Sequence, residues 1–319
     1  MNTMLLFAPH HSGALAGRIA DALGTPLSAS EEREFDGGEH KMCPLQDVRG
    51  RDVVVIQSLN GDAQASANDK LCRLLFFIGA LKDAGAGRVT ACVPYLAYAR
   101  KDRRTQPRDP VTTRYVAALF EAVAVDRVIV LDVHNEAAFD NAFRCETIRV
   151  EAAGVFAAQL AQRDAATRLV VASPDPGGVK RAQRFREALE QACGRSVDFS
   201  FMEKRRALGV VSGETFTGDV GDSNVVIYDD LIASGTTLLR AVHAARSAGA
   251  RRIDVIATHA AFLPAATQLF TDEGPDSVMV SDSIALPDAF VPLLRTRLTV
   301  CPIAPLLART IGELAHQPD

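Results

Sequence analysis

The sequence lacks the features of a membrane-embedded or disulfide-stapled protein. No apolar run among its 319 residues reaches the roughly 18 residues that a bilayer-spanning helix needs. The N-terminal stretch has no basic leader before its short apolar run. The six cysteines occur singly, without the paired spacing of a zinc site or the density of a disulfide scaffold. We therefore expect a cytoplasmic protein with reduced thiols and no membrane partner.

The chain also lacks a strong excess of either charge. Its net charge is -4, its pI is near 6.0, and hydrophobic and charged residues make up 48% and 23% of the sequence. This composition is typical of a globular protein and argues against a surface that binds nucleic acid as a whole. Any site for a polyanionic ligand must therefore be local, and at about 150 residues per domain the length suggests two domains.

Short apolar runs rich in β-branched residues alternate with segments of helical periodicity. Continuous rather than alternating apolarity indicates strands that are covered on both faces, as in parallel sheets. Expected strands are 52–58, 88–96, 127–134, 169–175, 224–230 and 252–262, and expected helices are 67–86, 111–124, 177–192 and 235–250. The fold class is therefore α/β, with mainly parallel sheets flanked by helices.

Similar exits from helix to strand hint at two related halves. These exits lie at 84–89, 123–128 and 248–253, and no low-complexity linker separates the halves. The stretch RCETIRVEAAGVFA is expected to start a new helix after a loop, so we divide the chain into domains 1–149 and 150–319. One large sheet is the alternative.

The stretch VVIYDDLIASGTTLLRA, residues 225–241, carries the clearest chemistry. It is expected to end a strand at Asp229 and Asp230 and to continue through small hydroxylated residues into a helix. Backbone N–H groups at a helix start can bind phosphate, and neighbouring carboxylates can accept hydrogen bonds from polyol hydroxyls. Together these groups indicate a sugar-phosphate site. The alternative is an ordinary turn in which Ser234 caps the helix.

Two further segments are rich in cations. Arg100, Lys101, Arg103, Arg104 and Arg108 follow an expected strand, a position that favours a nucleotide triphosphate site over a solvated basic face. The segment MEKRRALGVVSGETFTGDV, 202–220, is expected to be a long polar loop between strands, and loops of this length are often lids. A solvated basic turn is the alternative.

In order along the chain, these and other segments resemble the ribose-phosphate diphosphokinase family. The matching segments include VRGRDVVVIQS, VPYLAYARKDRR, DRVIVLDVHN, SPDPGGVKRA, MEKRR and the acidic stretch described above. The resemblance covers nearly the whole chain. It implies two similar domains of the type I phosphoribosyltransferase kind and a Mg²⁺-dependent transfer of diphosphate from ATP to ribose 5-phosphate.

The resemblance also implies a role for each matching residue. Arg100, Lys101 and Asp102 would contact ATP, and Phe35 and Glu39 would reach the nucleotide from a neighbouring subunit of a dimer within a larger homo-oligomer, a hexamer. Asp229, Asp230, Ser234, Gly235, Thr236 and Thr237 would bind ribose 5-phosphate. His134 and Asp175 match the magnesium positions, and Asp175 is the stronger candidate because Mg²⁺ prefers oxygen ligands. Lys204 and Arg206 match the two cations of the family's mobile catalytic loop.

Besides the interior of the 202–220 segment, ALGVVSGETF, the chain departs from the family pattern in three places. The turn FDGGE puts Asp36 one position early, Ala233 replaces an aspartate that many members carry, and EAAFDNAF follows His134 and Asn135. These departures motivate a second hypothesis, a nucleotide-sensing regulatory subunit, against which Lys204, Arg206 and Asp175 weigh. A phosphoribosyltransferase is a third hypothesis, but the sequence has an ATP-like basic loop in place of a hood that selects a base.

Overall fold

The computed structural model describes residues 4–161, 167–207 and 210–315, with the backbone alone for 204–207 and 210–214. The chain divides into two compact units, residues 1–150 with 303–319, and residues 151–302. The sequence-based division assigned 303–319 to the second domain. In the structure α8 (Ala304–Ala315) packs instead on α1 (Gly13–Leu23) of the first unit, because its apolar stripe is buried there.

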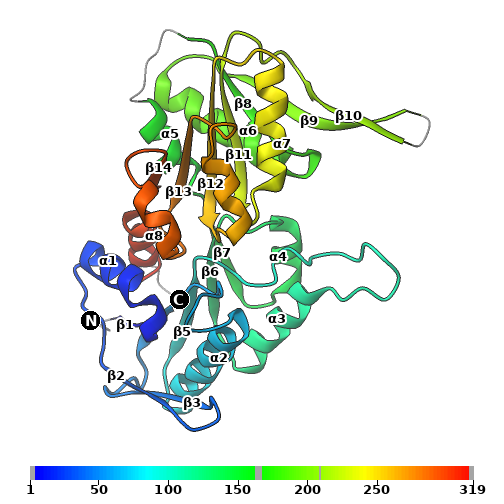
Figure 1. The fold of residues 1–319 in the computed structure, drawn as a ribbon. Helices are drawn as coiled ribbons and strands as arrows, with labels where there is room; N and C mark the ends of the chain where they lie inside the picture. The colour runs from blue at the N-terminus through cyan, green and yellow to red at the C-terminus, as the bar shows by residue number, and fades with distance from the viewer. Residues whose placement is uncertain (1–3, 162–166, 208–209, 316–319) are drawn as a thin grey trace. The chain divides into compact units, whose positions relative to one another are not determined.

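The first unit is built on a five-stranded parallel sheet in the order β1-β4-β5-β6-β7 (Figure 1). These strands are β1 (Leu5–Phe7), β4 (Asp52–Ile56), β5 (Arg88–Val93), β6 (Arg127–Leu131) and β7 (Glu146–Val150). The helices α2 (Ala67–Asp83), α3 (Thr112–Ala122) and α4 (Glu136–Ala142) cover one face of the sheet, and α8 packs on the other. A separate antiparallel ribbon pairs β2 (Ser30–Glu34) with β3 (His40–Pro44), and the 3-10 helix η1 (His10–Ser12) precedes α1.

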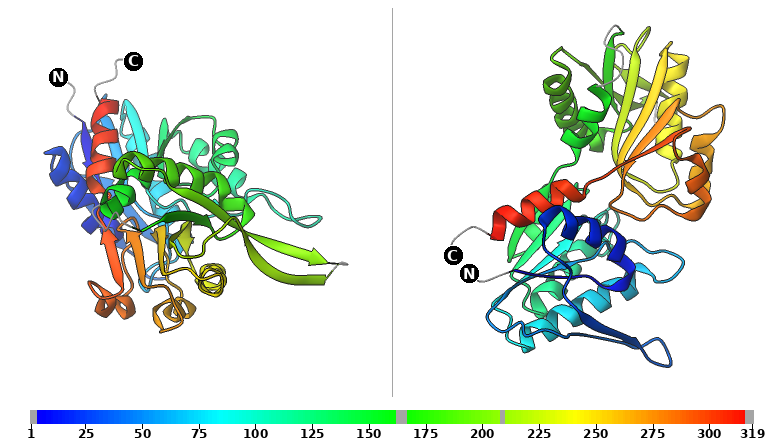
Figure 2. Two further views of the ribbon diagram at one scale, coloured as in Figure 1. Left: turned by 90° about the horizontal axis from the view of Figure 1, so that it is seen from above. Right: turned by 90° about the vertical axis from the view of Figure 1, so that its left-hand side faces the viewer.

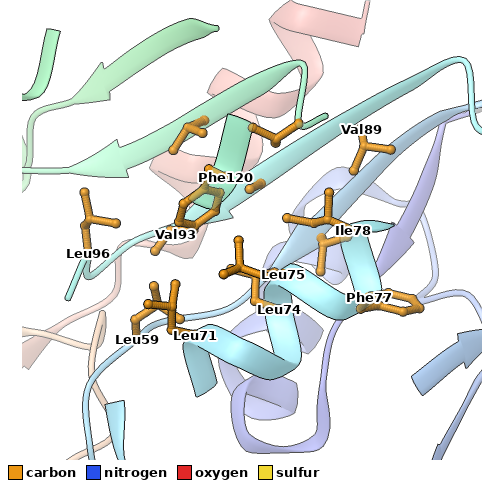
Figure 3. Packing of buried hydrophobic residues seen from close by; sticks show 14 of the residues in the cluster. Leu59, Leu71, Leu74, Leu75, Phe77, Ile78, Val89, Val93, Leu96 and Phe120 are labelled. Atoms are coloured by element: carbon orange, nitrogen blue, oxygen red, sulfur yellow. The ribbon is translucent and has the colours of Figure 1, made fainter. Parts of the chain in front are cut away.

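Burial on both faces explains the continuous apolar runs of this sheet. In β4, Val53 and Val55 lie in the core beneath α2, while Val54 and Ile56 are buried on the opposite face. Figure 3 shows the apolar side of α2 turned toward this core. A capping box in which Ser66 and Asp69 bond each other's backbone N–H groups starts α2. The buried pattern, and not β propensity alone, therefore defines these strands.

The second unit contains a seven-stranded sheet in the order β10-β9-β8-β11-β12-β13-β14, parallel except for β10. Its strands are β8 (Leu169–Ser173), β9 (Asp198–Ala207), β10 (Val210–Thr217), β11 (Asn224–Ile232), β12 (Arg252–Ala260), β13 (Ser277–Ser281) and β14 (Leu298–Cys301). Its helices are α5 (Ala153–Ala161), η2 (Pro176–Gly178), α6 (Val179–Cys193), α7 (Thr236–Ser247), η3 (Pro264–Phe270) and η4 (Asp288–Leu293). α7 packs on one face, and α5 and α6 cover the other, where Phe185 stacks on Tyr228 with ring centroids 4.3 Å apart.

The order in which strands are added to this sheet reverses between the parallel neighbours β8 and β11. From β8 the chain crosses through α6 to β9 on one side, and after β10 it returns to β11 on the other side of β8. In open α/β sheets, ligands bind beyond the carboxyl ends of the strands at such a reversal. The turn after β8 and the acidic end of β11 both lie at this point.

The α/β fold class with parallel sheets flanked by helices is confirmed, and each expected strand and helix has a counterpart. The expected loop at 202–220 is wrong, because β9 and β10 pair as an antiparallel ribbon through most of it (Figure 2). Residues 146–150 also form a strand, β7, where a loop was expected. In the described ranges no helix is long and apolar enough to cross a membrane.

Candidate functional site

The sequence suggested that Asp229 and Asp230 end a strand, but in the structure both residues lie inside β11. The strand continues to Ile232 and stays paired with β12, where Leu231 is opposite His259. On the other side, pairing with β8 stops at Ile227. Both carboxylates therefore belong to a strand that is held rigidly on one side and has passed the end of its neighbour on the other.

Arg181 in the first turn of α6 bridges the two carboxylates. Its Nη1 lies 2.8 Å from Oδ1 of Asp229 and 3.0 Å from Oδ1 of Asp230, and the three side chains are 17%, 19% and 8% exposed. The backbone N–H of Asp230 also donates to Oδ1 of Asp229 at 2.9 Å. Sequence reasoning missed Arg181. A cation in the first helical turn after SPDPGG was the available signal.

Two carboxylates share one guanidinium, and this arrangement perturbs the first of them. Burial and the neighbouring Asp230 carboxylate raise the pKa of Asp229 well above the usual 3.8, against the opposing effect of Arg181. The folded protein thus resists ionisation of Asp229. Carboxyl groups with strongly shifted pKa values are common at functional sites.

Replacing Asp229 by asparagine is expected to stabilise the protein while weakening the site. With a raised folded-state pKa, the contribution of Asp229 to stability is present at low pH and is lost as pH rises from 3.8 through the folded-state value. The thermal midpoint of Asp229→Asn should therefore exceed that of the wild type by about 2–4 °C at about pH 8, and by less at about pH 5. Scanning calorimetry at both pH values measures this gap, and a gap that narrows as pH rises would contradict the assignment.

The segment after β11 forms a tight start to α7. Gly235 is the N-cap residue, with φ of 76°, so the alternative in which Ser234 occupies the N-cap position is wrong. Ser234 Oγ lies 3.1 Å from Thr236 Oγ1 and accepts a hydrogen bond from the Thr236 N–H at 3.4 Å. The backbone N–H groups of Phe262 and Leu263 donate to the carbonyls of Ile232 and Ala233 and fix the loop. Hydroxyls and the positive end of a helix dipole thus gather beside the carboxylates.

Gly235→Ala is expected to damage this loop more than its φ angle alone requires. A Cβ at this position would lie 2.7 Å from Cδ1 of Leu269, in addition to the left-handed strain. Gly249, at φ of 85° after α7, has no neighbour closer than 3.9 Å and is the matched control. Chemical denaturation should show Gly235→Ala less stable than Gly249→Ala by about 1–3 kcal/mol. Equal losses would show that the contact with Leu269 is unimportant.

The turn between β8 and α6 presents Asp175. Its Oδ1 accepts from the N–H of Gly178 at 2.9 Å, and Ser173 Oγ donates to the Asp175 carbonyl at 2.7 Å. The residue is exposed, while Gly178 is buried and has no room for a side chain, since a Cβ would lie 2.8 Å from Ser173 Oγ. The sequence therefore needs glycine here to bring the turn close to the strand.

Of the two predicted magnesium ligands, Asp175 suits Mg²⁺ better than His134 does. An exposed carboxylate on a braced turn is the kind of ligand that Mg²⁺ combines with waters and substrate phosphates. His134 is exposed too, in the turn after β6 of the first unit, but imidazole is a poorer partner for this ion. Within the described ranges, no three His, Cys, Asp or Glu side chains are grouped so that they could hold a metal ion.

In the first unit, the basic loop and the turn of His134 are joined. Asp102 accepts a hydrogen bond from Asn135 Nδ2, which links the loop after β5 to the turn after β6. Lys101 Nζ lies 2.6 Å from Oδ2 of Asp109 and so braces the loop, while Arg100 is exposed. Hydrogen bonds from Lys101 and Thr105 hold the pKa of the Asp109 carboxyl well below its usual range. The loop is thus a built structure with cations on its surface.

Phe35 and Glu39 flank the turn of the β2–β3 ribbon. Phe35 is 42% exposed, the Arg33 guanidinium lies 5.0 Å from its ring centroid, and its N–H donates to the Glu39 carbonyl at 2.8 Å. Gly37 and Gly38, with φ of 88° and 85°, form the turn. Among the described residues, no hydrogen bond or ion pair joins this tip to Arg100, Lys101 or Asp102.

Lys204 and Arg206 lie in β9, where their backbones pair with Glu214 and Val211 of β10. Their side chains are outside the described part of the structure. The pairing register slips between Val211 and Gly213, a bulge that increases the local twist of the ribbon. Both predicted catalytic residues are therefore carried by paired strands and not by an irregular loop.

Comparison with known proteins places these features in a family. Residues 4–123 match the N-terminal domain of ribose phosphate pyrophosphokinase, and residues 147–284 match the phosphoribosyl transferase domain. The chain is 34% identical to a ribose-phosphate pyrophosphokinase of Haemophilus ducreyi, covering 99% of this chain and 97% of the relative. It is 35% identical to that of Vibrio cholerae, covering 99% and 98%.

A solved structure supports the same relationship. The phosphoribosylpyrophosphate synthetase of Mycobacterium smegmatis has 30% sequence identity with this chain and a TM-score of 0.87. The match covers 98% of this chain and 99% of that one. The fold of two phosphoribosyltransferase-type domains is therefore shared along the whole length.

Proposed function

The chain belongs to the ribose-phosphate pyrophosphokinase family, and we propose that it transfers diphosphate from ATP to ribose 5-phosphate in a Mg²⁺-dependent reaction. The products are AMP and 5-phospho-α-D-ribose 1-diphosphate. The observation that carries this proposal is the pair of carboxylates on β11, held by Arg181 beside the start of α7.

The acceptor sugar would bind at this point of the second unit. Asp229 and Asp230 would bond the ribose hydroxyls, and Ser234 through Thr237 would bind the 5-phosphate at the helix start. The raised pKa of Asp229, caused by burial and by the neighbouring Asp230 carboxylate, supports this, because strongly shifted pKa values are common at functional sites. Arg181 would keep the pair compact when the sugar is absent.

The donor nucleotide would bind through groups of the first unit. The exposed Arg100 and the braced loop of Lys101 and Asp102 would contact the phosphates, and Phe35 and Glu39 would contact the base. An exposed aromatic ring that already stacks with a guanidinium can stack on adenine instead. Asp175 and His134 would hold Mg²⁺, which supplies charge neutralisation at the phosphates.

The reaction is an in-line displacement at the β-phosphorus. The anomeric oxygen of ribose 5-phosphate forms a bond to Pβ, the bond from Pβ to the oxygen bridging to Pα breaks, and AMP leaves as the hydroxyl proton is released. Catalysis of this kind depends on positioning and on charge neutralisation, with no covalent enzyme intermediate. Lys204 and Arg206 would neutralise charge that develops on the transferred group.

Formation of AMP in the presence of ribose 5-phosphate tests the proposal. Purified protein with Mg²⁺ and ATP should form AMP only when the sugar phosphate is added, over a range of inorganic phosphate concentrations. Absence of AMP formation at every phosphate concentration would contradict the proposal and favour a regulatory subunit. Release of pyrophosphate from the activated sugar and a nucleobase would favour a phosphoribosyltransferase.

We also propose that the active form is a dimer within a larger homo-oligomer. Glu39 and Phe35 lie on a ribbon tip with no polar link to the basic loop among the described residues, and in the proposal they serve a neighbouring subunit's nucleotide. Sedimentation of the active protein should therefore show an oligomer, of which the hexamer is the expected form. A monomer with full activity would contradict this proposal.

A further inference from the structure

A polar cluster, largely buried except for the His10 side chain, fastens the β2–β3 ribbon to the rest of the first unit. Its centre is Glu32 of β2, whose side chain is only 4% exposed. Glu32 Oε2 accepts from the backbone N–H of His10 at 2.9 Å, and Oε1 lies 2.9 Å from Nε2 of His40 in β3. Arg73 of α2 brings Nη1 to 3.8 Å from Oε1. We call these four residues the Glu32 clamp.

The Glu32 clamp joins three separate parts of the chain. His10 lies in η1, Glu32 and His40 lie in the ribbon, and Arg73 lies in the middle of α2. Arg73 also pairs with Glu34 at 2.7 Å and contacts Nε2 of His11 at 3.2 Å. An isolated two-stranded ribbon is marginally stable at best, so its orientation depends on such anchors.

The Glu32 clamp buries several polar side chains. The side chains of His40 and Arg73 are 5% and 12% exposed, and the Nδ1 atom of His40 has no hydrogen-bond partner within the described ranges. Buried ionic groups contribute little net stability, but they fix one arrangement because the alternatives leave a charge unpaired. Geometry of the ribbon, and not stability alone, is what this cluster controls.

We propose that Glu32 is a positioning residue for the nucleotide: by fixing the ribbon to η1 and α2, it holds Phe35 and Glu39 in the arrangement that binds ATP. This inference rests on the proposed function. Glu32 lies three residues before Phe35 on the same strand arm, and Arg73 braces Glu34 next to it. If the ribbon is competent for only part of the time, the apparent affinity for ATP falls by that fraction.

The chain offers a matched control on the same strand. Glu31 faces the other side of the ribbon, where it pairs with Lys41 at 3.1 Å with both side chains nearly half exposed. Exposed pairs of this kind contribute little. Glu32→Gln and Glu31→Gln make the same chemical change one residue apart, and only the first disrupts the clamp.

Two readouts separate positioning from simple destabilisation. The sequence contains no tryptophan, so Phe35→Trp places a single tryptophan, which can be excited selectively, at the ribbon tip. Time-resolved anisotropy of this reporter, with Glu32→Gln or Glu31→Gln added, measures local motion of the ribbon without any need for activity. In proteins that keep Phe35, steady-state kinetics give KM for ATP, KM for ribose 5-phosphate and kcat.

With Glu32→Gln we expect faster local motion at the tip and a KM for ATP raised about tenfold, with KM for ribose 5-phosphate changed less than about twofold. Glu31→Gln should leave the local motion at the tip and both KM values as they are in the parent protein. If Glu32→Gln does not fold, Arg73→Gln loosens the clamp from the side of α2 and should give a smaller rise confined to ATP.

Three results with Glu32→Gln would overturn the inference. These are unchanged local motion at the ribbon tip, faster motion at the tip with an unchanged KM for ATP, or equal rises in KM for ATP and KM for ribose 5-phosphate. The proposed function fails separately. A parent protein that forms no AMP would contradict the diphosphate transfer, whereas the anisotropy would still report whether the clamp fixes the ribbon.

Discussion

Lys204→Ala is expected to lower kcat about a thousandfold while leaving KM for ribose 5-phosphate within about threefold. In the proposed reaction, this cation contacts the transferred group only as negative charge shifts between the phosphates. Its loss should therefore raise the barrier without weakening ground-state binding of the sugar. Steady-state AMP formation by wild type and variant measures both constants.

Arg205→Ala is the matched control for this prediction. Arg205 lies between the two predicted catalytic residues in β9, opposite Gly213 of β10, and carries the same charge as its neighbours. It should retain at least about a third of the wild-type kcat, because a charge away from the transferred group acts only through screened electrostatics. Equal losses in Lys204→Ala and Arg205→Ala would mean that the ribbon needs net positive charge and not a specific cation.

Arg181→Leu is expected to destabilise the protein by about 3 kcal/mol, which corresponds to a fall of roughly 6–12 °C in the thermal midpoint of the second unit. The substitution leaves Asp229 and Asp230 side by side, largely buried, and without their shared guanidinium. Binding of ribose 5-phosphate should fall as well, because the carboxylates then lose their fixed separation. Calorimetry and sugar-dependent AMP formation measure the two effects.

Two further variants give this prediction a control. Arg184 lies on the same helix and pairs with Glu151 at 3.0 Å in a more exposed setting, so Arg184→Leu should cost less than about 1 kcal/mol. Adding Asp229→Asn to Arg181→Leu should recover more than half of the lost stability, because a neutral amide replaces one of the two buried carboxyl groups that have lost their shared guanidinium. Additive losses in the double variant would show that Arg181 does not act through Asp229.

The sequence predicted β4, β5, β6, β8, β11 and β12, which are buried on both faces, but it did not predict β13, which is buried in the same way. The central parts of two of these strands, VVVI at 53–56 and VVIY at 225–228, are apolar at every position, as expected for strands covered on both faces. The sequence did not predict β2, in which four of five residues are charged, or β3, in which polar and apolar residues are mixed, nor β9 and β10 as a paired ribbon. Those strands are stabilised by pairing and by contacts between distant residues, which leave no apolar signal in a single stretch.

The candidate site shows the same division. Asp175, Asp229 and Gly235 could be found because the ends of apolar runs and the starts of helices have local sequence signals. Arg181 and Glu32 could not be assigned a role, because their importance comes from partners that are distant in the sequence. Arg181 pairs with Asp229, 48 residues away, and Glu32 bonds His10, 22 residues away. Gly235 was predicted as a phosphate ligand, but its close approach to Leu269 is visible only in the folded chain.

The central claim is the transfer of an intact diphosphate, and the products of one reaction test it most directly. With Mg²⁺, ATP and ribose 5-phosphate, phosphorus NMR of the reaction mixture should show AMP and 5-phospho-α-D-ribose 1-diphosphate appearing in equal amounts, with both requiring the sugar phosphate. Formation of ADP together with a singly phosphorylated product at the anomeric carbon, or no sugar-dependent change in ATP, would contradict the account.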